Sequence, residues 1–282
     1  MSRVWRWFGN NLIRVYAFLG FTYLFVPIAY TFVSSFNDSG KSNLTWRGFT
    51  FANWQNPCGA PDVCTALGNS IKVGLLSTLF ATLLGTLIAF ALGRHSFKGR
   101  SSTNLLIFLP MATPEVVMGA SLLAMFLSFK INPGFVTTVI AHIMFCISFV
   151  VVTVKARIAS LDPRLEQAAM DLYANEFQTF RRVTLPLVAP GIAGAALLSF
   201  SLSFDDFIIT NFNSGTTVTF PLYVYTHAER GLPAQANVIG SSMFFLALII
   251  VLVGQFVTRR SRSTSTSSRS RRPLRLGVRK TT

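Results

Sequence analysis

The chain has 282 residues, of which 51% are hydrophobic and only 12% are charged, and 27 of them are phenylalanine. Charged residues make up about a quarter of an ordinary soluble domain, so this composition excludes one and indicates a membrane protein. The formal net charge of +15 does not by itself indicate nucleic-acid binding, because nine of the 25 lysines and arginines lie in residues 259–282.

Six stretches are long and apolar enough to cross a bilayer, since a spanning helix needs about 20 apolar residues. They are residues 13–35, 70–92, 104–128, 135–155, 188–211 and 238–258. The first follows a basic amphipathic lead, but its apolar run is long for a signal peptide and no good cleavage site follows it. We therefore expect an uncleaved first helix and an all-α membrane protein with about six transmembrane helices, in a domain covering residues 13–258.

The basic residues are divided unevenly between the two sides of the membrane. If the N-terminus lies inside, the inside segments hold 20 of the lysines and arginines and the outside segments hold four. Basic segments near membrane spans stay in the cytoplasm. The sequence therefore predicts a multi-pass protein of the cell (inner or plasma) membrane with both termini cytoplasmic, residues 1–12 forming a short basic N-terminus.

The C-terminal residues 259–282, RRSRSTSTSSRSRRPLRLGVRKTT, contain no acidic residue. A serine- and arginine-rich segment of this kind cannot bury a hydrophobic core. It is therefore predicted to be a disordered cytoplasmic tail. Because it follows the last span directly, we expect it to contact anionic lipid headgroups and not nucleic acid.

The three cysteines fall in two settings. Cys58 and Cys64 share an outside loop, on the side where disulfides persist, but their spacing does not decide between a disulfide and two free thiols. Cys146 lies in the fourth span and is interpreted as a small packing residue.

The second span carries small residues every fourth position, which places them on one face of a helix: Ser77, Ala81, Gly85, Ala89 and Gly93. Small residues at this spacing let helix backbones approach closely in lipid. The stripe predicts a helix packing face.

The loop between the fourth and fifth spans, residues 156–187, reads ARIASLDPRLEQAAMDLYANEFQTFRRVTLPL. Asp162 followed by Pro163 is a typical helix start. Apolar residues then recur at helical spacing: Leu165, Ala168, Ala169, Leu172, Phe177 and Phe180. Such an amphipathic helix either folds back on the membrane domain or docks into a groove on a cytoplasmic partner.

The segment LDPRLEQAAMDLYANEFQTFRRVTLPLVAPGI resembles the EAA loop of type I ABC importer permeases. The stretches NWQNP, ALGNSIKVGLLSTLFATLLGTLIAFALGR, FLPMATPEVVMGASLL, SFDDFIIT and FPLYVY resemble the second permease subunit of spermidine/putrescine importers. The likeness covers roughly residues 50–258.

The positions that match the EAA pattern are implied to couple the chain to an ATPase: Glu166, Ala168, Ala169, Asp171, Leu172, Ala174, Leu185 and Pro186. The family's usual glycine is replaced by Tyr173. Glycine permits a positive φ that costs other residues about 1 kcal/mol or more. Either this loop stays right-handed through Tyr173 or it turns differently.

The resemblance implies the type I ABC importer permease fold and a set of partners. A second homologous permease subunit completes the pore, a cytoplasmic ATP-binding subunit acts as a dimer beneath it and uses ATP and Mg²⁺, and an extracytoplasmic substrate-binding protein delivers the solute. This chain is not expected to be an enzyme or to bind a cofactor, because it lacks a GxxxxGK[ST] loop. His95, His142 and His227 lie in different segments without metal-ligand spacing.

Within the fifth span, the stretch LLSFSLSFDDFIITNF carries two adjacent carboxylates, Asp205 and Asp206. Carboxylates inside a span are costly unless they face water, a partner or cargo. Successive residues of a helix point about 100° apart, so only one of the two is expected to face the pore squarely. They either contact the ammonium groups of a polyamine or have a structural role, pairing with a basic residue of the partner permease or capping the helix end near Asn211 and Asn213.

Two further residues are candidates for the substrate pathway. Glu115 follows Pro114 in the third span, where a proline can open the backbone toward a cavity; alternatively Glu115 bonds a neighbouring backbone at a kink. Trp54 could offer its aromatic face to a cation or could simply be an interfacial anchor.

The sequence thus predicts a permease subunit of an ABC importer for polyamines. Two alternatives remain: the same machine importing another small solute, such as an organic cation, an iron complex or a phosphonate, and an autonomous secondary transporter that uses the carboxylates as a proton relay.

Overall fold

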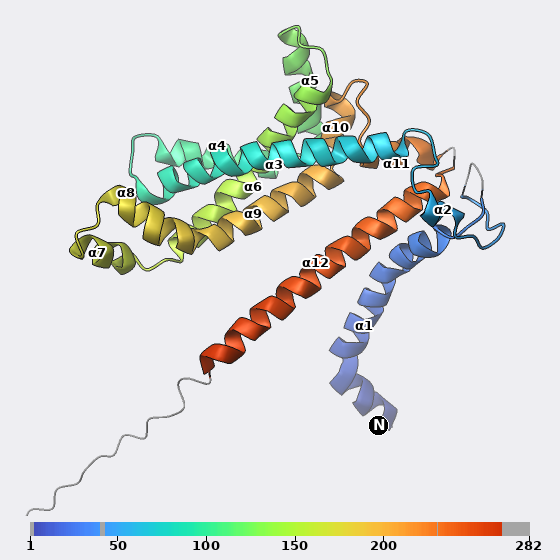
Figure 1. Cartoon of the computed structure of the whole chain (residues 1–282), viewed down its shortest axis with the longest axis horizontal. Helices are drawn as coiled ribbons and strands as arrows, with labels where there is room; N and C mark the ends of the chain where they lie inside the picture. The colour runs from blue at the N-terminus through green and yellow to red at the C-terminus, as the bar shows by residue number, and fades with distance from the viewer. Residues whose placement is uncertain (1–2, 40–42, 230, 267–282) are drawn as a thin grey trace, which may run out of the picture. The chain divides into compact units, whose positions relative to one another are not determined.

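The computed structural model describes residues 3–39, 43–229 and 231–266 (Figure 1). Helices account for most of this part of the chain: α1 (Arg3–Ser34), α2 (Ala52–Gln55), α3 (Val63–Arg94), α4 (Arg100–Ala112), α5 (Glu115–Ser128), α6 (Phe135–Ala159), α7 (Arg164–Asp171), α8 (Glu176–Thr179), the π-helical turn η1 (Phe180–Thr184), α9 (Leu185–Asp205), α10 (Ile208–Asn213), α11 (Phe220–Ala228) and α12 (Ala234–Thr266). The all-α prediction is confirmed.

The chain divides into two compact units, residues 1–59 with 233–282 and residues 60–232. In the first unit α12 packs against α1 and α2. An aromatic contact joins Phe32 of α1 to Phe245 of α12, with ring centroids 5.3 Å apart. This unit therefore holds the two terminal membrane helices together.

The core of the second unit is formed where α3, α6 and α9 pack against one another. The small-residue stripe of α3 is a packing face, as predicted, and its two glycines lie against α6. Gly85 lies so close to α6 that an added Cβ would be 2.7 Å from Cγ1 of Val150, and a Cβ on Gly93 would be 3.2 Å from Cγ2 of Ile158. The absence of side chains at these positions allows the close approach of the two helices.

Within the described residues, five helical stretches are long and apolar enough to span a membrane: Asn11–Ser34, Val63–Arg94, Phe135–Ala159, Glu176–Asp205 and Ala234–Val253. The pair α4 and α5 forms a sixth if it is counted as one broken span. The predicted number of about six spans agrees with this. The fifth span differs in its limits, because it starts at 176 and ends at 205, where residues 188–211 were predicted.

The third predicted span, residues 104–128, is broken into α4 and α5, which meet at 108°. The break falls at Thr113 and Pro114, where the backbone is extended. Proline lacks a backbone N–H and disfavours a helical residue before it, so the chain changes direction here. Glu115 is consequently the first residue of α5.

The short helix α10 packs against α5. The side-chain amide of Asn213 donates hydrogen bonds to the carbonyl oxygens of Gly119 and Ile209, at 3.2 and 3.0 Å. Gly119 has no room for a side chain, since a Cβ would lie 2.8 Å from the ring of Phe212. These contacts hold the first turns of α5 against α10, the helix that follows α9.

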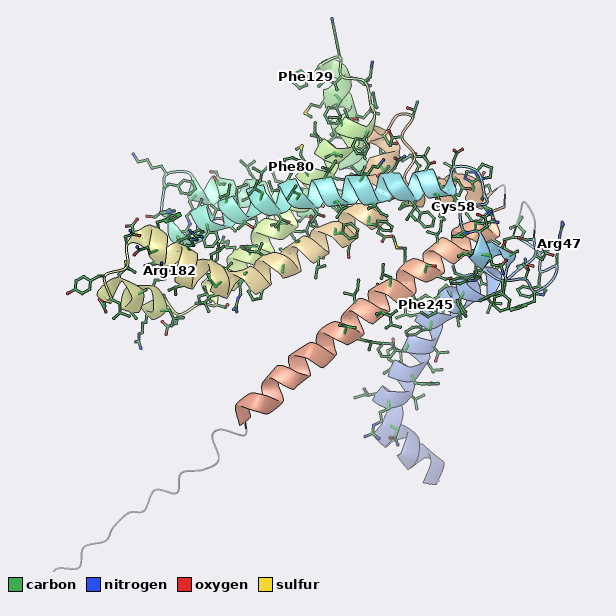
Figure 2. All side chains as sticks on the ribbon, in the orientation of Figure 1. Arg47, Cys58, Phe80, Phe129, Arg182 and Phe245 are labelled. Carbon is green, nitrogen blue, oxygen red and sulfur yellow. The ribbon has the colours of Figure 1, made fainter. Side chains whose placement is uncertain are left out.

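Large apolar side chains cover much of the exterior of the second unit. Phe80 of α3 and Phe129 at the end of α5 point outward (Figure 2), and Phe129 is 69% exposed. Exposed apolar surface on this scale is rare on monomeric soluble proteins, and it is the surface that contact with lipid requires.

At the chain ends the helices run further than predicted. α1 begins at Arg3, inside the predicted N-terminal segment, and α12 continues to Thr266. Residues 259–266 are therefore helical where the tail was predicted to be disordered, because extending an existing helix avoids the cost of nucleation. Residues 267–282 lie outside the described residues.

Cys58 and Cys64 are both disulfide-bonded, which resolves the alternative that the sequence left open. Cys146 is free and buried in α6, as expected of a packing residue.

Candidate functional sites: the loop helix and the acidic cavity

The loop between α6 and α9 contains the helix α7, which begins as the sequence predicts. The Asp162 carboxylate accepts the backbone N–H of Arg164 at 2.9 Å. Glu166 lies in the first turn, where a negative charge interacts favourably with the helix dipole. The helix start is therefore specified by local residues alone.

The end of α7 is a Schellman turn centred on Tyr173. The backbone N–H of Tyr173 donates to Met170 and that of Ala174 to Ala169, at 2.9 and 3.2 Å. This pattern needs a left-handed residue, and Tyr173 adopts it with φ 63°. The loop thus keeps the backbone shape of a glycine at this position, with a tyrosine side chain that is 98% exposed.

Most of the predicted apolar stripe is exposed. Leu165, Leu172 and Phe177 are 46%, 82% and 69% exposed. Phe180 alone of the large apolar residues in the stripe packs inward, with its ring 5.2 Å from that of Phe90 on α3. The stripe does not fold back on the second unit, and this leaves an apolar surface available to a partner.

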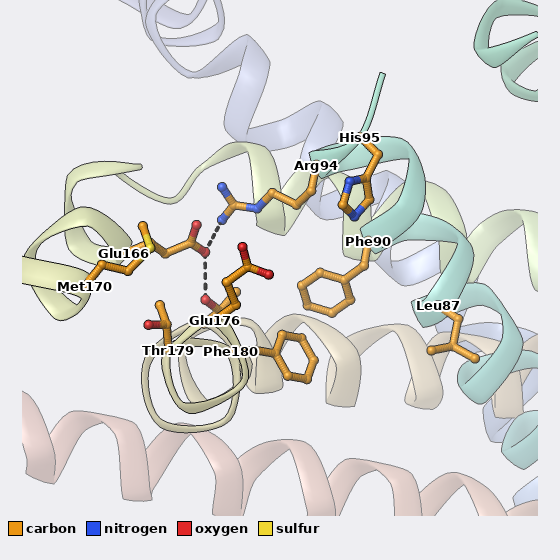
Figure 3. Close-up of a pocket in the computed structure, with 10 residues that line it drawn as sticks. Leu87, Phe90, Arg94, His95, Glu166, Met170, Glu176, Thr179 and Phe180 are labelled. Carbon is orange, nitrogen blue, oxygen red and sulfur yellow. Dashed lines mark hydrogen bonds and ion pairs between the residues drawn. The ribbon is translucent and has the colours of Figure 1, made fainter. Parts of the chain in front are cut away.

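Glu166 connects three elements of the second unit (Figure 3). One of its carboxylate oxygens accepts hydrogen bonds from Arg94 at the end of α3, at 2.5 Å, and from the Thr184 hydroxyl in η1, at 2.7 Å. The three residues border a cavity of about 400 Å³ that Phe90 and Phe180 also line. Glu166 therefore links α7 to the end of α3 and, through Thr184, to the turn that precedes α9.

The remaining predicted coupling residues surround this point. Ala168 and Asp171 are exposed on α7, whereas Ala169 and Ala174 are half-buried. Leu185 and Pro186 form the first turn of α9, directly after η1. The structure thus places all of them on α7, on the turn that follows it or at the start of α9.

The π-helical turn η1 was not predicted. Pi-helical turns often occur at functional sites, and this one joins the loop to a membrane helix. Beyond it, the guanidinium of Arg157 on α6 donates two hydrogen bonds to the Leu187 carbonyl, at 3.0 and 2.8 Å. Gly191 leaves the space for that side chain, since a Cβ would lie 2.7 Å from Cβ of Arg157.

At its other end α9 stops at Asp205, beside a second cavity of about 390 Å³. This cavity is lined by three carboxylates and by aromatic and aliphatic side chains: Glu115, Asp205, Asp206, Phe145, Phe207, Ile208, Leu202 and Ser201. Three of the four residues predicted to line a substrate pathway therefore lie together, with Glu115 supplied by α5.

The two adjacent aspartates have different environments. Asp205 is exposed to the cavity, whereas Asp206 is only 8% exposed. The Asp206 carboxylate accepts the backbone N–H groups of Ile209 and Thr210, at 3.2 and 2.9 Å. Asp206 thus has a structural role, as one alternative proposed, but it caps the start of α10 and not the helix end near Asn211 and Asn213.

A buried histidine contacts Asp206 and was not recognised as functional from the sequence. His142 on α6 is 1% exposed, and its Nε2 lies 3.3 Å from an Asp206 carboxylate oxygen. Its Nδ1 lies 2.7 Å from the Ser203 hydroxyl. The available signal was an ionisable residue inside an apolar span, which is a functional candidate by default.

Trp54, the fourth predicted pathway residue, belongs to the first unit. Its indole N–H donates to the Ser35 hydroxyl at 2.9 Å, and its ring stacks on Phe36 with centroids 5.6 Å apart. These contacts fit an anchored aromatic residue. Its contact with cargo stays a prediction.

We predict that Tyr173→Gly stabilises the end of α7, because glycine removes a left-handed strain of roughly 1 kcal/mol. Tyr173→Val should destabilise the turn, since a β-branched residue is poorly tolerated at positive φ. Amide hydrogen exchange of peptides covering residues 164–180 should slow in the glycine variant and accelerate in the valine variant. Equal exchange in both variants would show that the turn carries no strain.

The chain matches the family described as "Binding-protein-dependent transport system inner membrane component" over residues 81–262. Curated relatives match nearly the whole chain. It is 35% identical over 252 residues to the spermidine/putrescine transport system permease protein PotC of Escherichia coli (strain K12), covering 89% of this chain and 93% of the relative. It is 31% identical over 252 residues to the putrescine transport system permease protein PotI of the same strain, covering 86% and 89%.

Solved structures share the fold at low sequence identity. A bacterial ABC transporter that imports the acidic polysaccharide alginate contains a chain with a TM-score of 0.63 and 17% identity, covering 92% of this chain and 98% of that one. A chain of the methionine ABC transporter MetNI has a TM-score of 0.55 and 14% identity, covering 70% and 93%. The chain therefore belongs to the family of multi-pass inner-membrane permease components of binding-protein-dependent transport systems.

Proposed function

We propose that this chain is the permease subunit of an ATP-driven importer of polyamines such as spermidine and putrescine. The observation that carries the proposal is the cavity at the end of α9, which Asp205 and Glu115 line together with the aromatic residues Phe145 and Phe207. The identity of 35% to a spermidine/putrescine permease over 252 residues supports the same cargo.

The cavity chemistry suits a polyamine, in which ammonium groups alternate with methylene segments. Carboxylates compensate ammonium groups that have lost water, and apolar walls accommodate the methylene segments. Asp205 is exposed in the cavity, so it can exchange one ammonium group for the next. An importer needs contacts of this transient kind, because cargo that binds tightly does not leave.

Coupling to ATP is proposed to occur through α7. Its exposed apolar residues, Leu165 and Leu172, have the spacing with which an amphipathic helix enters a groove on a partner. The partner is a cytoplasmic ATP-binding subunit, present as a dimer, which holds ATP and Mg²⁺ and performs the hydrolysis. A second homologous permease subunit provides the other half of the pore, and an extracytoplasmic binding protein delivers the cargo.

We propose that α9 carries the movement of the α7 loop to the acidic cavity. Glu166 fixes its beginning through Thr184, and the 21 residues of α9 extend about 30 Å at the usual helical rise to Asp205 in the cavity. A rotation of α9 driven from the loop would change the direction in which Asp205 points. Hydrolysis at one end would thereby alter cargo contacts at the other.

We propose an orientation in which both termini and α7 are cytoplasmic. The distribution of basic residues supports this orientation. The disulfide-bonded state of Cys58 and Cys64 supports it too, since disulfides persist on the oxidising side of the membrane. The basic tail would then meet anionic lipid headgroups.

Docking is tested by adding one negative charge at adjacent positions of α7. Ala168→Glu places a carboxylate between Leu165 and Leu172, where docking would remove it from water, and should lower transport and copurification of the ATP-binding subunit by at least about tenfold. Gln167→Glu, which adds the same charge beside the stripe, should retain both. Transport at the wild-type rate with Ala168→Glu would exclude α7 as the coupling helix.

The cargo is tested by uptake of labelled spermidine and putrescine into cells that contain the complete transporter. Asp205→Asn and Glu115→Gln should each reduce uptake by roughly tenfold, because each removes a charge-assisted contact, whereas Asp205→Glu should retain most of it. Membrane expression and copurification of the ATP-binding subunit serve as controls. Wild-type uptake in both neutral variants would remove these acids from the pathway, and absence of uptake in the wild type would reject polyamines as the cargo.

A further inference from the structure

A buried polar network lies where α3, α6, α9 and α10 meet, next to the acidic cavity. His142 is at its centre and is 1% exposed. Its Nδ1 contacts the Ser203 hydroxyl at 2.7 Å and its Nε2 contacts the Thr210 hydroxyl at 2.9 Å. Ser203 in turn contacts the Ser77 hydroxyl of α3 at 2.9 Å. Every member of this network has its polar atoms within hydrogen-bonding distance of another, so the hydrogens can be counted.

On the Nδ1 side, the neighbouring serine hydroxyls donate their hydrogens to groups other than His142. Ser77 donates its only hydroxyl hydrogen to the Val73 carbonyl, because a carbonyl can only accept. The contact between Ser77 and Ser203 is therefore made with the hydrogen of Ser203. Ser203 then has no hydrogen left for His142, and Nδ1 must be the donor to Ser203.

On the Nε2 side, His142 also faces acceptors. The Thr210 hydroxyl donates to an Asp206 carboxylate oxygen at 3.0 Å, and the same oxygen accepts the Thr210 backbone N–H at 2.9 Å. What remains for Nε2 is the oxygen of Thr210 and the carboxylate of Asp206, at 2.9 and 3.3 Å. If the Thr210 hydrogen pointed to Nε2 instead, the Asp206 oxygen would face the Thr210 oxygen at 3.0 Å and Nε2 at 3.3 Å with no hydrogen in either contact. Donation by Nε2 leaves a hydrogen for all of these contacts, so this arrangement is the one that the geometry favours.

We propose that His142 carries a proton on both ring nitrogens and acts as a positioning residue: as an imidazolium it neutralises Asp206 and holds it as the cap of α10. Asp206 is then a structural carboxylate, and Asp205 with Glu115 supplies the uncompensated negative charge among the residues that line the cavity. The assignment of a structural role to Asp206 and a cargo contact to Asp205 rests on the proposed function, whereas the protonation of His142 does not.

The charge balance predicts how substitutions behave. His142→Gln leaves the buried Asp206 carboxylate without its cation. Removing one partner of a buried ion pair destabilises a protein more than replacing both partners, because an unpaired buried charge is strongly unfavourable. The double variant His142→Gln/Asp206→Asn removes both charges and keeps amide groups that can donate and accept. If the pair is structural, the double variant should therefore work better than the single one.

Protonation is measured directly on the full chain in lipid bilayers by ¹⁵N solid-state NMR with ¹⁵N-labelled histidine. The chain contains three histidines, so His95→Gln/His227→Gln leaves His142 as the only one. The expected spectrum has two protonated ring nitrogens. A neutral imidazole, with one protonated and one unprotonated nitrogen, would overturn the proposal whatever the cargo of the transporter is.

The positioning role is measured by polyamine uptake with the complete transporter. His142→Gln should lower uptake by at least about tenfold, and the added Asp206→Asn should restore it to within about threefold of wild type. Ser148→Ala is the matched control, because Ser148 is buried on the same helix and its hydroxyl has no hydrogen-bond partner among the described residues.

Two results would contradict the positioning role. If the double variant assembles but transports as poorly as Asp205→Asn, Asp206 is itself a cargo contact. If the double variant assembles no better than His142→Gln, the pair does not act through charge compensation. If polyamines are not the cargo, the wild-type transporter would show no polyamine uptake, while the NMR spectrum would still show two protonated ring nitrogens on His142.

Discussion

The structure depends on satisfying polar groups at a helix break that water does not reach. Where α9 ends and α10 begins, backbone N–H groups lose their helical acceptors, and Asp206 supplies carboxylate oxygens to those of Ile209 and Thr210. A buried carboxylate needs a compensating partner, and His142 provides it. The histidine needs acceptors of its own, which include Ser203 on α9. One break thus fixes the relative positions of α6, α9 and α10.

The beginning of α9 is held by a different kind of contact. Glu166, Arg94 and Thr184 join the loop to α3 and η1 through hydrogen bonds that are partly exposed to solvent. Ion pairs in such settings contribute little to stability, at most about 1 kcal/mol. They are therefore suited to being remade during a cycle of motion, whereas the buried network is suited to staying intact. Between the two ends, small residues on α3 let the helices pack closely without large side chains that would have to rearrange.

The spans, the loop helix and the acidic residues could be predicted because they depend on local composition. Apolar runs define helices that cross a bilayer, and Asp162 with Pro163 specifies a helix start from adjacent residues alone. The break at Pro114 was also predictable, whereas the 108° angle between α4 and α5 was not, because α5 also packs against α10, which lies far away in the sequence.

Other features depend on contacts between distant residues. Asp205 and Asp206 are chemically identical in the sequence, and their roles are separated by contacts that form only in the fold: those of Asp206 with His142 on another helix and with the backbone N–H groups of α10. The early start of the fifth span at Glu176 includes polar residues such as Arg181 and Arg182, which hide it from a hydropathy scan. Tyr173 shows the opposite case: backbone hydrogen bonds at the end of α7 impose a left-handed conformation that its own preference disfavours.

The central claim is that α9 transmits motion from the loop to the cavity, and thiol labelling of Asp205→Cys in the reconstituted transporter tests it most directly. The introduced thiol would be the reactive one in the described part of the chain, since Cys58 and Cys64 are disulfide-bonded and Cys146 is buried. The account predicts that the rate of labelling by a cationic methanethiosulfonate changes by about tenfold or more between the nucleotide-free and the ATP-vanadate-trapped states, and that Ala168→Glu abolishes this change. Equal rates in the two states of a transporter that hydrolyses ATP would contradict it.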